Sequence, residues 1–250
     1  MRESFYAEYF RVEDRHWWFV GRRKIVLGLL ADRLDAGAAG GRRVLDLGCG
    51  TGTMLGHLRR FGAVEGIDAD QRAIEFCRAR GEDSVRLLES DRLPFADETF
   101  DLVTALDVLE HIEDDQAIAA EIERVLKPRG VLLATVPANP WMWGAQDEIS
   151  HHFRRYRARQ LRRTLSDGRL EVERLTHFNT VLFPPVAGIR GARRILHRPG
   201  RYQRSDFEMT KAGRVNDLLG AVFASEAGWL RHRDLPFGVS LLCVATKRGN

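Results

Sequence analysis

The feature that most constrains this chain is an alternation of short apolar segments with amphipathic ones between residues 42 and 137. The apolar segments have the length of buried strands, and the segments between them have helical periodicity. The predicted strands are 42–48, 63–68, 84–90, 100–106 and 131–137, and the predicted helices are 52–62, 70–81 and 113–130. This alternation predicts a parallel sheet that right-handed crossovers cover with helices on both faces.

The flanking segments extend this scheme. Residues 22–35 have helical periodicity and precede the glycine- and alanine-rich segment 36–41. The C-terminal part is predicted to contain helices at 157–167, 184–198 and 214–230, a polar link after the second of them, and strands at 169–179 and 237–248. A chain of 250 residues fits one large α/β domain.

Two absences bear on the expected location. No apolar run approaches the length of a membrane-spanning helix, and the N-terminus lacks the apolar centre of a signal peptide. The three cysteines, Cys49, Cys77 and Cys243, are scattered and form no C-x-x-C pair. This usage is typical of a reducing compartment, so we expect a cytoplasmic protein with unpaired cysteines.

The positive charge is concentrated in one region. Residues 151–205 hold 14 arginines and only three acids, although the net charge of the whole chain is +4. Such asymmetry is compatible with an anionic partner or with arginine-rich solvated helix faces.

The segment "VLDLGCGTGTM" at residues 44–54 indicates a strand that ends in a tight, ligand-binding turn. Its glycines, Gly48, Gly50 and Gly52, depart from the dinucleotide pattern G-x-G-x-x-G, because Thr53 occupies the third glycine position. A carboxylate at Asp46 would repel a pyrophosphate but would suit an ammonium or sulfonium group. S-adenosylmethionine carries both of these cations and no phosphate.

Two further acids follow later strands. Asp68 ends the strand 63–68, where an acid accepts hydrogen bonds from ribose hydroxyls, while Asp70 is predicted to cap the following helix. Asp91 follows the next strand, and its carboxylate could accept a hydrogen bond from an adenine amino group.

Together these motifs resemble the class I S-adenosylmethionine-dependent methyltransferases. The resemblance rests on D-x-G-x-G-x-G, Asp68, Asp91 before "LPF" and "ETFDLV", then "LEHI" and "LKPRGVLLATVP", and it covers residues 42–137. It is closest to the small-molecule branch that resembles ubiquinone- and menaquinone-biosynthesis enzymes. The resemblance implies a Rossmann-like, doubly wound α/β sheet of seven strands, ordered 3-2-1-4-5-7-6, with the last strand antiparallel.

The resemblance also implies a division of labour within a single domain, 1–250. Residues 1–40 would form an N-terminal helical lid, 41–137 the cofactor-binding core, and 138–250 a substrate-side cap with a helical insertion and the last two strands. The implied cofactor residues are Asp46, Gly48, Gly50, Gly52, Asp68, Asp91, Arg92 and Leu106. Of these, Asp46, Gly48 and Gly52 would lie by the methionine half, and Asp91 with Arg92 by the adenine.

Residues 15–23 are one candidate for the substrate pocket. Trp17 and Trp18 lie before the predicted first helix and could form a lid or pack that helix onto the sheet. Since adjacent side chains point in different directions, we expect that both tryptophans cannot face one core.

Residues 137–156 follow the fifth strand at the sheet edge where substrates bind. Trp141 and Trp143 would share a side if this segment were extended, and Asp147 would contact His151 on a helical turn. The resemblance favours a histidine and an Arg-Tyr pair here, which His152, Arg155 and Tyr156 match in kind.

A metal site is the alternative for the acids and histidines of this segment. Glu148 and His151 form an E-x-x-H pair, but one such pair supplies too few ligands, so no metal is expected. A third candidate, His111, follows the fourth strand, where a helix N-terminus would depress its pKa. His111, His151 and His152 are the candidate catalytic residues, and capping or surface roles are the alternative for each.

The expected partner is a small molecule. The N/D-P-P-Y/F motif of nucleic-acid amino-methyltransferases is missing after the fourth strand, so we expect no nucleic acid, although "HHFRRYRARQLRR" leaves RNA open. Residues 181–198 read as a basic amphipathic helix with Arg190, Arg193, Arg194 and Arg198, suited either to an anionic membrane surface or to capping the sheet. The oligomeric state stays open.

The sequence therefore favours methyl transfer from S-adenosylmethionine to oxygen, nitrogen or carbon of a small, acidic or lipid-linked metabolite. Two alternatives remain: the same fold used for non-methylating chemistry, and a non-catalytic S-adenosylmethionine-binding regulatory or membrane-surface protein.

Overall fold

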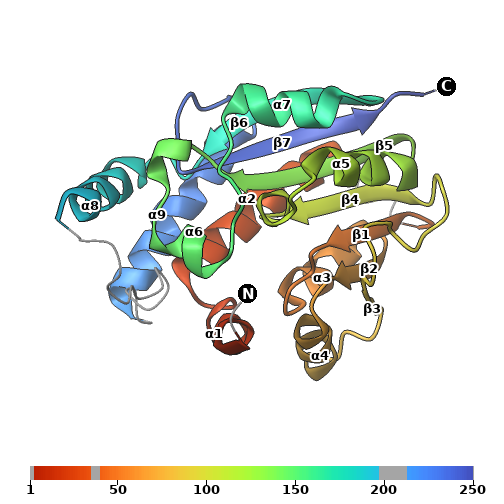
Figure 1. The fold of residues 1–250 in the computed structure, drawn as a ribbon, viewed down its shortest axis with the longest axis horizontal. Coiled ribbons are helices and arrows are strands. Elements are labelled where there is room, and N and C mark those ends of the chain that lie inside the picture. The colour runs from red at the N-terminus through yellow and green to blue at the C-terminus, as the bar shows by residue number, and fades with distance from the viewer. Residues whose placement is uncertain (1–2, 35–39, 197–212, 250) are drawn as a thin grey trace.

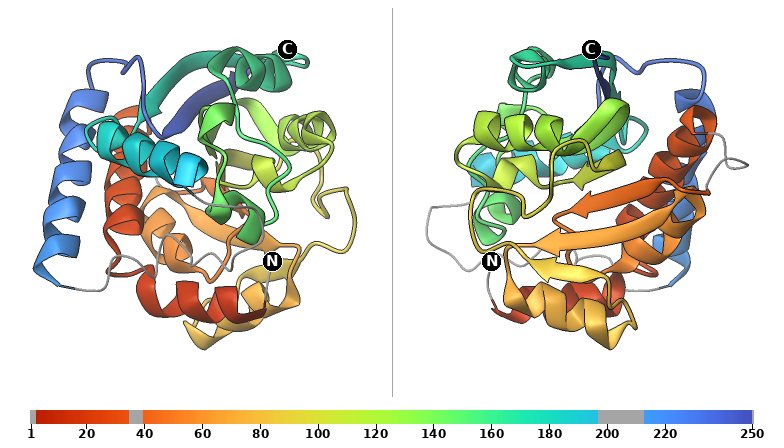
Figure 2. Two further views of the ribbon diagram at one scale, coloured as in Figure 1. Left: turned by 60° about the vertical axis from the view of Figure 1, so that its left-hand side comes forward. Right: turned by 90° about the vertical axis from the view of Figure 1, so that its right-hand side faces the viewer.

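A seven-stranded sheet with helices on both faces forms the centre of the molecule (Figures 1 and 2). The computed structural model describes residues 3–34, 40–196 and 213–249. The strand order is β3-β2-β1-β4-β5-β7-β6, and β7 runs antiparallel to both of its neighbours. The first five strands pair in parallel, so their carboxyl ends meet at one edge of the sheet.

The elements follow one another in the alternating order that the sequence predicts. The strands are β1 (Arg43–Leu47), β2 (Ala63–Asp68), β3 (Val85–Leu87), β4 (Phe100–Leu106), β5 (Leu126–Pro137), β6 (Leu170–Phe178) and β7 (Ser240–Lys247). The described helices are α1 (Glu3–Val12), α2 (Trp17–Arg33), α3 (Thr53–Leu58), α4 (Gln71–Ala79), α5 (Asp115–Val125), α6 (Ala145–Ile149), α7 (Ala158–Ser166), α8 (Phe183–Leu196) and α9 (Arg214–Leu230). Short 3-10 turns lie at η2 (Arg59–Phe61), η3 (Leu109–His111) and η4 (Pro140–Met142).

Two hydrophobic cores lie on the two faces of the sheet. Successive strand residues alternate between them: Leu102 packs in the core with α2, α3 and α9, whereas Val103 packs in the core with α5 and α7. A smaller cluster around Ile74 and Cys77 anchors α4 beside β3. Both faces are therefore buried, which explains why the strands read as continuous apolar runs.

Helices α2 and α9 run side by side on one face of the sheet (Figure 2). Gly21 of α2 faces the ring of Phe223 on α9, and a Cβ at Gly21 would overlap that ring. Phe223 also stacks on Phe178 of β6, with ring centroids 6.0 Å apart. The missing side chain of Gly21 thus allows α9 to pack close to the N-terminal half of α2.

The N-terminal helix α1 is held against α4. Phe10 packs on Phe76 with ring centroids 4.9 Å apart, and Arg80 pairs with Glu13 at 2.7 Å and with Asp14 at 2.9 Å. These contacts bring α1 to the carboxyl edge of the sheet, beside the turn that follows β1.

The fold class is confirmed, including the strand order and the antiparallel last strand. The predicted cap Asp70 does accept a hydrogen bond from the Arg72 backbone amide at 3.0 Å. The helix predicted over 113–130 is wrong at its end, since α5 stops at Val125 and Leu126 begins β5. A register shift in the pairing of β4 with β5 accommodates residues 127–130, where Pro128 cannot continue a helix.

The first long helix also differs from the prediction, because α2 begins at residue 17 and not at 22. His16 accepts a hydrogen bond from the Trp18 amide and so caps α2. Most of the segment 36–41, the link after 198 and Arg198 itself lie outside the described residues. Within the described ranges, no helix combines the length and the apolarity that a membrane crossing requires.

The α2–α9 contact yields a stability prediction. Gly21→Ala should lower the free energy of unfolding by about 1–3 kcal/mol, because the added methyl group overpacks the contact with Phe223. Gly28→Ala, in the same helix with no atom within 4 Å of the new Cβ, should raise it by about 0.5–1 kcal/mol. Urea denaturation of both variants measures the difference, and equal stability of the two would contradict the tight contact.

Candidate functional site

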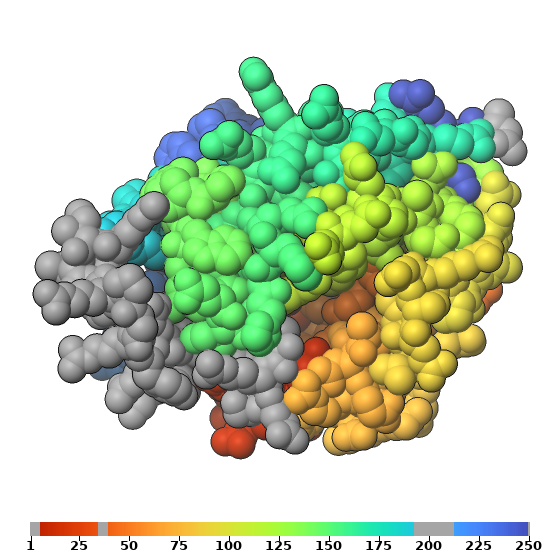
Figure 3. Space-filling model, in the orientation of Figure 1, coloured from red at the N-terminus to blue at the C-terminus, as the bar shows by residue number. Residues whose placement is uncertain are grey.

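A cavity of about 1290 Å³ opens at the carboxyl ends of β1, β2 and β4. Its wall combines the turn after β1, the ends of β2 and β4, the start of α2, the loops around His111 and His152, and part of α8. Figure 3 shows the surface hollowed between green residues of the second half of the chain and orange and yellow residues that follow β1. The cavity is thus built from segments far apart in the sequence.

The turn after β1 has left-handed backbone at its glycines. The φ angles are 68° at Gly48, 56° at Gly50 and 88° at Gly52. A Cβ at Gly48 would overlap the side chain of Val108, whereas Gly50 faces open space and lines the cavity. This backbone can therefore approach a ligand closely, as the sequence suggests.

Asp46 is a buried carboxylate in the cavity wall. It is 3% exposed, and its Oδ1 accepts a hydrogen bond of 2.6 Å from the Thr104 hydroxyl. Burial raises the pKa of Asp46 to about 7, although the Thr104 hydrogen bond and the charge of Arg22 oppose this shift. A cationic ligand would stabilise its charged form.

Asp68 lies at the end of β2, next to the glycine turn. It accepts hydrogen bonds from the backbone amides of Gly50 at 2.9 Å and Asp70 at 3.0 Å, one to each carboxylate oxygen. Each oxygen retains acceptor capacity for a ligand hydroxyl. Burial raises the pKa of Asp68.

The other predicted cofactor residues divide into two groups. Asp91 and Leu106 line the cavity. Arg92 is exposed, and neither Arg92 nor Gly52 is among the cavity-lining residues in the described part of the chain. The roles assigned to all of these residues remain predictions.

Trp17 and Trp18 both border the cavity from the first turn of α2. Both also pack against the same hydrophobic core, so the expectation that they could not is wrong. The reason is that α2 begins at Trp17, and its first turn lies between the core and the cavity. Arg22 lies 4.5 Å over the Trp18 ring and pairs with Asp107, which closes this side of the wall.

The residues after β5 do not form the predicted Asp147–His151 pair. Asp147 is fully buried, and its Oδ1 lies 3.0 Å from Nδ1 of His152 and 2.7 Å from Nε of Arg155. His151 has φ of 55°, which turns the chain after α6 so that His152 reaches Asp147 instead. Burial alone would raise the pKa of Asp147, but its hydrogen bond to His152 and the charges of Arg155 and Arg190 lower it.

The aromatic residues of this segment are less central than predicted. Trp141 and Trp143 are 52% and 37% exposed, lie at a 3-10 turn rather than in an extended segment, and are not among the described residues of the cavity wall. Tyr156 is also outside that wall, because its buried hydroxyl donates to Asp115 at 2.7 Å. His151, His152 and Arg155 do line the cavity.

His111 lies at the end of the 3-10 turn η3, several residues before α5 begins. Burial and the charge of His152 lower the pKa of His111 to about 3. The pKa is therefore lowered as predicted, but the predicted cause, a helix N-terminus, is wrong. The rings of His111 and His152 meet edge to face, with centroids 4.5 Å apart.

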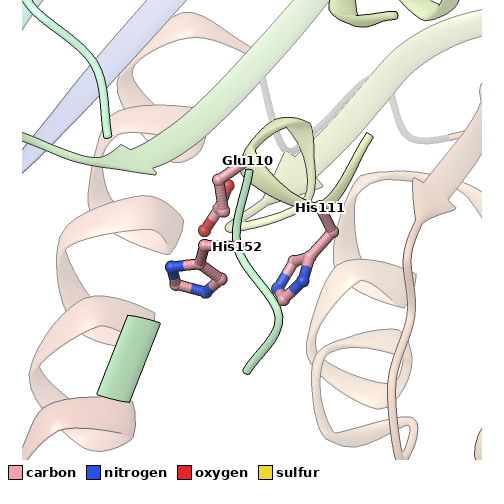
Figure 4. Close-up of side chains that lie close together, drawn as sticks. All are labelled: Glu110, His111 and His152. Carbon is pink, nitrogen blue, oxygen red and sulfur yellow. The ribbon is translucent and has the colours of Figure 1, made fainter. Parts of the chain in front are cut away.

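Glu110 completes a cluster with these two histidines, and sequence reasoning missed it (Figure 4). Its side chain is fully buried, and neither carboxylate oxygen has a hydrogen-bond partner among the described residues. Potential ligand atoms of Glu110, His111 and His152 lie within 4.8 Å of one another. The available signal was the Glu110-His111 pair flanked by the apolar residues Leu109 and Ile112 in "LEHI".

The helix α8 forms part of the cavity wall. Val186 and Ile189 line the cavity, and Arg190 turns inward, donating to the Met142 carbonyl at 2.8 Å and lying 3.7 Å from Asp147. Arg190 thus contributes to the site rather than to an outer basic face. Membrane contact of residues 181–198 remains a prediction.

Comparisons with known proteins agree with this architecture. Residues 45–134 match the methyltransferase domain family. A ubiquinone biosynthesis O-methyltransferase of Neisseria meningitidis is 32% identical over 148 residues, which are 54% of this chain and 62% of that protein. The match therefore spans less than two thirds of the relative's length.

Two solved structures have a similar fold. A chain of the complex between the Haloferax volcanii Trm112 methyltransferase activator and a putative methyltransferase has a TM-score of 0.61 at 20% identity, covering 99% of this chain and 96% of that one. The cyclase SpnF has a TM-score of 0.58 at 23% identity, covering 91% of this chain and 81% of its own. At these identities the likeness concerns the fold alone.

The Asp147 network yields a second prediction. Asp147→Asn should lower the free energy of unfolding by about 3–5 kcal/mol, because it leaves the buried Arg155 guanidinium without its counter-charge. Glu148→Gln, at the exposed neighbouring position, should change it by less than about 0.5 kcal/mol. Guanidinium denaturation compares them, and a neutral Asp147→Asn variant would contradict the structural role of this carboxylate.

Proposed function

Since residues 45–134 carry a methyltransferase domain and the chain has the fold of S-adenosylmethionine-dependent methyltransferases, we propose that this protein methylates a hydroxyl oxygen of a small, apolar or lipid-linked acceptor. The observation that carries this proposal is the cavity itself. It joins the acids at the ends of β1 and β2 to the histidines after β4 and α6 in one continuous space. Oxygen is favoured as the acceptor because the matched relative is named an O-methyltransferase.

The residues present fit S-adenosylmethionine. Asp46 offers a buried carboxylate for the methionine ammonium, Asp68 has lone pairs for ribose hydroxyls, and Gly50 leaves open space beside the ligand. When bound, the cofactor supplies an electrophilic methyl carbon: an acceptor lone pair forms the new C–O bond, the C–S electron pair returns to sulfur, and the hydroxyl proton leaves.

The contribution of the chain is chiefly orientation. Aligning an acceptor with a bound methyl donor contributes about 7–11 kcal/mol when both are held in a reactive arrangement. Asp46 and Asp68 hold one partner at the sheet edge, while Trp17, Trp18 and Val186 offer an apolar surface for the other. The same aromatic and aliphatic groups exclude water from the reacting centre.

Contact with the acceptor hydroxyl is assigned to the histidine end of the cavity. His111 is neutral near pH 7, because its pKa is lowered to about 3, and its ring can accept a hydrogen bond from an acceptor hydroxyl. Asp147 orients His152 beside it. A base contributes about 10²–10⁴-fold only when its pKa lies near the working pH, so a histidine with this lowered pKa orients the hydroxyl through a hydrogen bond and does not act as a strong base.

The remaining assignments extend the same proposal. The chain acts as one domain, with 1–40 as the lid and 138–250 as the cap. The proposed compartment is the cytoplasm, which the three unpaired cysteines Cys49, Cys77 and Cys243 support. Residues 181–198 would meet a membrane surface only while presenting a lipid-linked acceptor to the cavity.

Transfer of a radiolabelled methyl group tests the proposal. The wild-type chain should transfer label from S-adenosylmethionine into the organic-soluble fraction of a cell extract and release one S-adenosylhomocysteine per transfer. Asp68→Ala should weaken S-adenosylhomocysteine binding by about 1–3 kcal/mol, since a ligand hydroxyl loses its partner. Asp32→Asn, at a surface ion pair with Arg231, is the control.

Three outcomes would contradict the proposal. Binding of the cofactor without any transfer indicates a non-catalytic protein, and consumption of an acceptor without S-adenosylhomocysteine indicates non-methylating chemistry. If Asp68→Ala binds S-adenosylhomocysteine as tightly as wild type, Asp68 does not bind the ribose hydroxyls.

The raised pKa of Asp46 yields a pH prediction. Below its pKa of about 7 the carboxyl is protonated and cannot pair with the ligand ammonium, so the affinity for S-adenosylhomocysteine should rise with pH. Well below that pKa, the affinity can rise by at most about tenfold per pH unit. Calorimetry between about pH 6 and about pH 8 measures this slope. Asp46→Asn should flatten the pH dependence of this affinity, whereas the control Asp101→Asn, at a surface pair with Lys127, should keep it. If wild type and Asp46→Asn show the same dependence of affinity on pH, Asp46 does not pair with the ligand ammonium.

A further inference from the structure

Glu110, His111 and His152 converge on one point of the cavity wall from two separate loops. Glu110 and His111 belong to η3 after β4, and His152 follows α6. One potential ligand atom of each residue lies within 4.8 Å of those of the other two. In Figure 4 the carboxylate of Glu110 points toward the His152 ring, with the His111 ring on the other side of the chain that carries His152.

Among the residues that the structure describes, the carboxylate of Glu110 has no hydrogen-bond partner that would explain its burial. The side chain is fully buried, and neither oxygen forms a hydrogen bond within the described residues. The neighbouring arginines are engaged elsewhere, since Arg22 pairs with Asp107 and Arg155 with Asp147. The charged form of such a carboxylate costs several kcal/mol, so the group is either protonated or compensated by a bound cation.

His152 is oriented as a metal-binding histidine is. Its Nδ1 lies 3.0 Å from Oδ1 of Asp147, which leaves Nε2 for another ligand. Asp147 is itself fixed by the Gly144 amide at 2.8 Å and by Arg155 at 2.7 Å. Histidines that bind metal ions usually donate their second ring N–H to a carboxylate, which fixes the orientation of the ring.

The two loops are also fixed relative to each other. The Phe153 amide donates to the Glu110 carbonyl at 2.8 Å, and the His152 amide donates to the Asp147 carbonyl at 2.9 Å. The three side chains therefore need little rearrangement to close around an ion.

We propose that Glu110, His111 and His152 bind one divalent transition-metal ion of the zinc type, with its open coordination positions facing the cavity. Two imidazoles and one carboxylate form a ligand set that suits Zn²⁺ or Fe²⁺, whereas Mg²⁺ and Ca²⁺ prefer oxygen ligands alone. Three protein ligands leave a position for an exogenous oxygen. This site differs from the E-x-x-H pair considered from the sequence and departs from the expectation of no metal.

The role of the ion in catalysis rests on the proposed function, although its binding does not. With the ion bound, His111 would be a ligand and would no longer accept the hydrogen bond of the acceptor hydroxyl. A hydroxyl that coordinates the ion would instead lose its proton to water more readily, because the positive charge stabilises the resulting oxyanion. The oxyanion then supplies the electron pair of the new C–O bond. No oxidant or reductant is needed.

Metal titration of the full chain tests the proposal directly. The protein is dialysed against a chelator and titrated with Zn²⁺ by calorimetry, and in parallel with Co²⁺ by visible absorption. We expect one equivalent of Zn²⁺ and Co²⁺ bands of a four- or five-coordinate site. Glu110→Gln and His152→Ala should each weaken Zn²⁺ binding by at least about 10–100-fold.

The control is His232→Ala, which removes an exposed histidine that does not line the cavity and should leave Zn²⁺ affinity unchanged. Thermal unfolding and S-adenosylhomocysteine affinity establish that each variant is folded, and the two ligand variants serve independently if one fails to fold. No Zn²⁺ uptake by the wild-type chain, or uptake that survives both ligand substitutions, would overturn the proposal. Zn²⁺ binding without methyl transfer would instead contradict the proposed function and leave the metal site standing.

Discussion

The reversal of the chain after β1 is the constraint on which the rest of the site depends. The backbone must leave the central strand and enter α3 while leaving open space at the sheet edge, which requires left-handed conformations at Gly48 and Gly50. Because Gly48 also packs against Val108, the same turn sets how closely the loop after β4 approaches β1. That loop carries Glu110 and His111, so the position of both ends of the cavity follows from this one turn.

Asp147 has the corresponding role in the second half of the chain. A single buried carboxylate contacts His152, Arg155 and Arg190, and so joins α6, the following loop and α8. Its contacts stabilise a wall that lacks the hydrogen-bond ladder of a strand. A buried charge of this kind stabilises only while all of its partners are present, which makes this wall a unit rather than a set of separate contacts.

Within the described part of the chain, three buried acids of the cavity have no arginine that pairs with them alone. Asp46 and Asp68 lie at one end and Glu110 at the other, and burial raises the pKa of each. The neighbouring Arg22 and Arg155 have carboxylate partners of their own. Electrostatically the site is therefore arranged for cationic occupants, which accords with a sulfonium cofactor at the first end and a metal ion at the second.

The sequence by itself determined the sheet and the cofactor end, because both depend on local patterns. Apolar runs specify β2 and β4 with the observed bounds, and the spacing of acids and glycines places Asp46 and Asp68 at adjacent strand ends of a parallel sheet. Only the tertiary structure decided the arrangement at the histidine end of the cavity. The partner of Asp147 is His152 rather than His151 because one left-handed residue reverses the loop, and the isolation of Glu110 becomes visible only when the surrounding segments are packed. Contacts between distant segments depend on how loops pack against one another, and local periodicity carries no record of that packing.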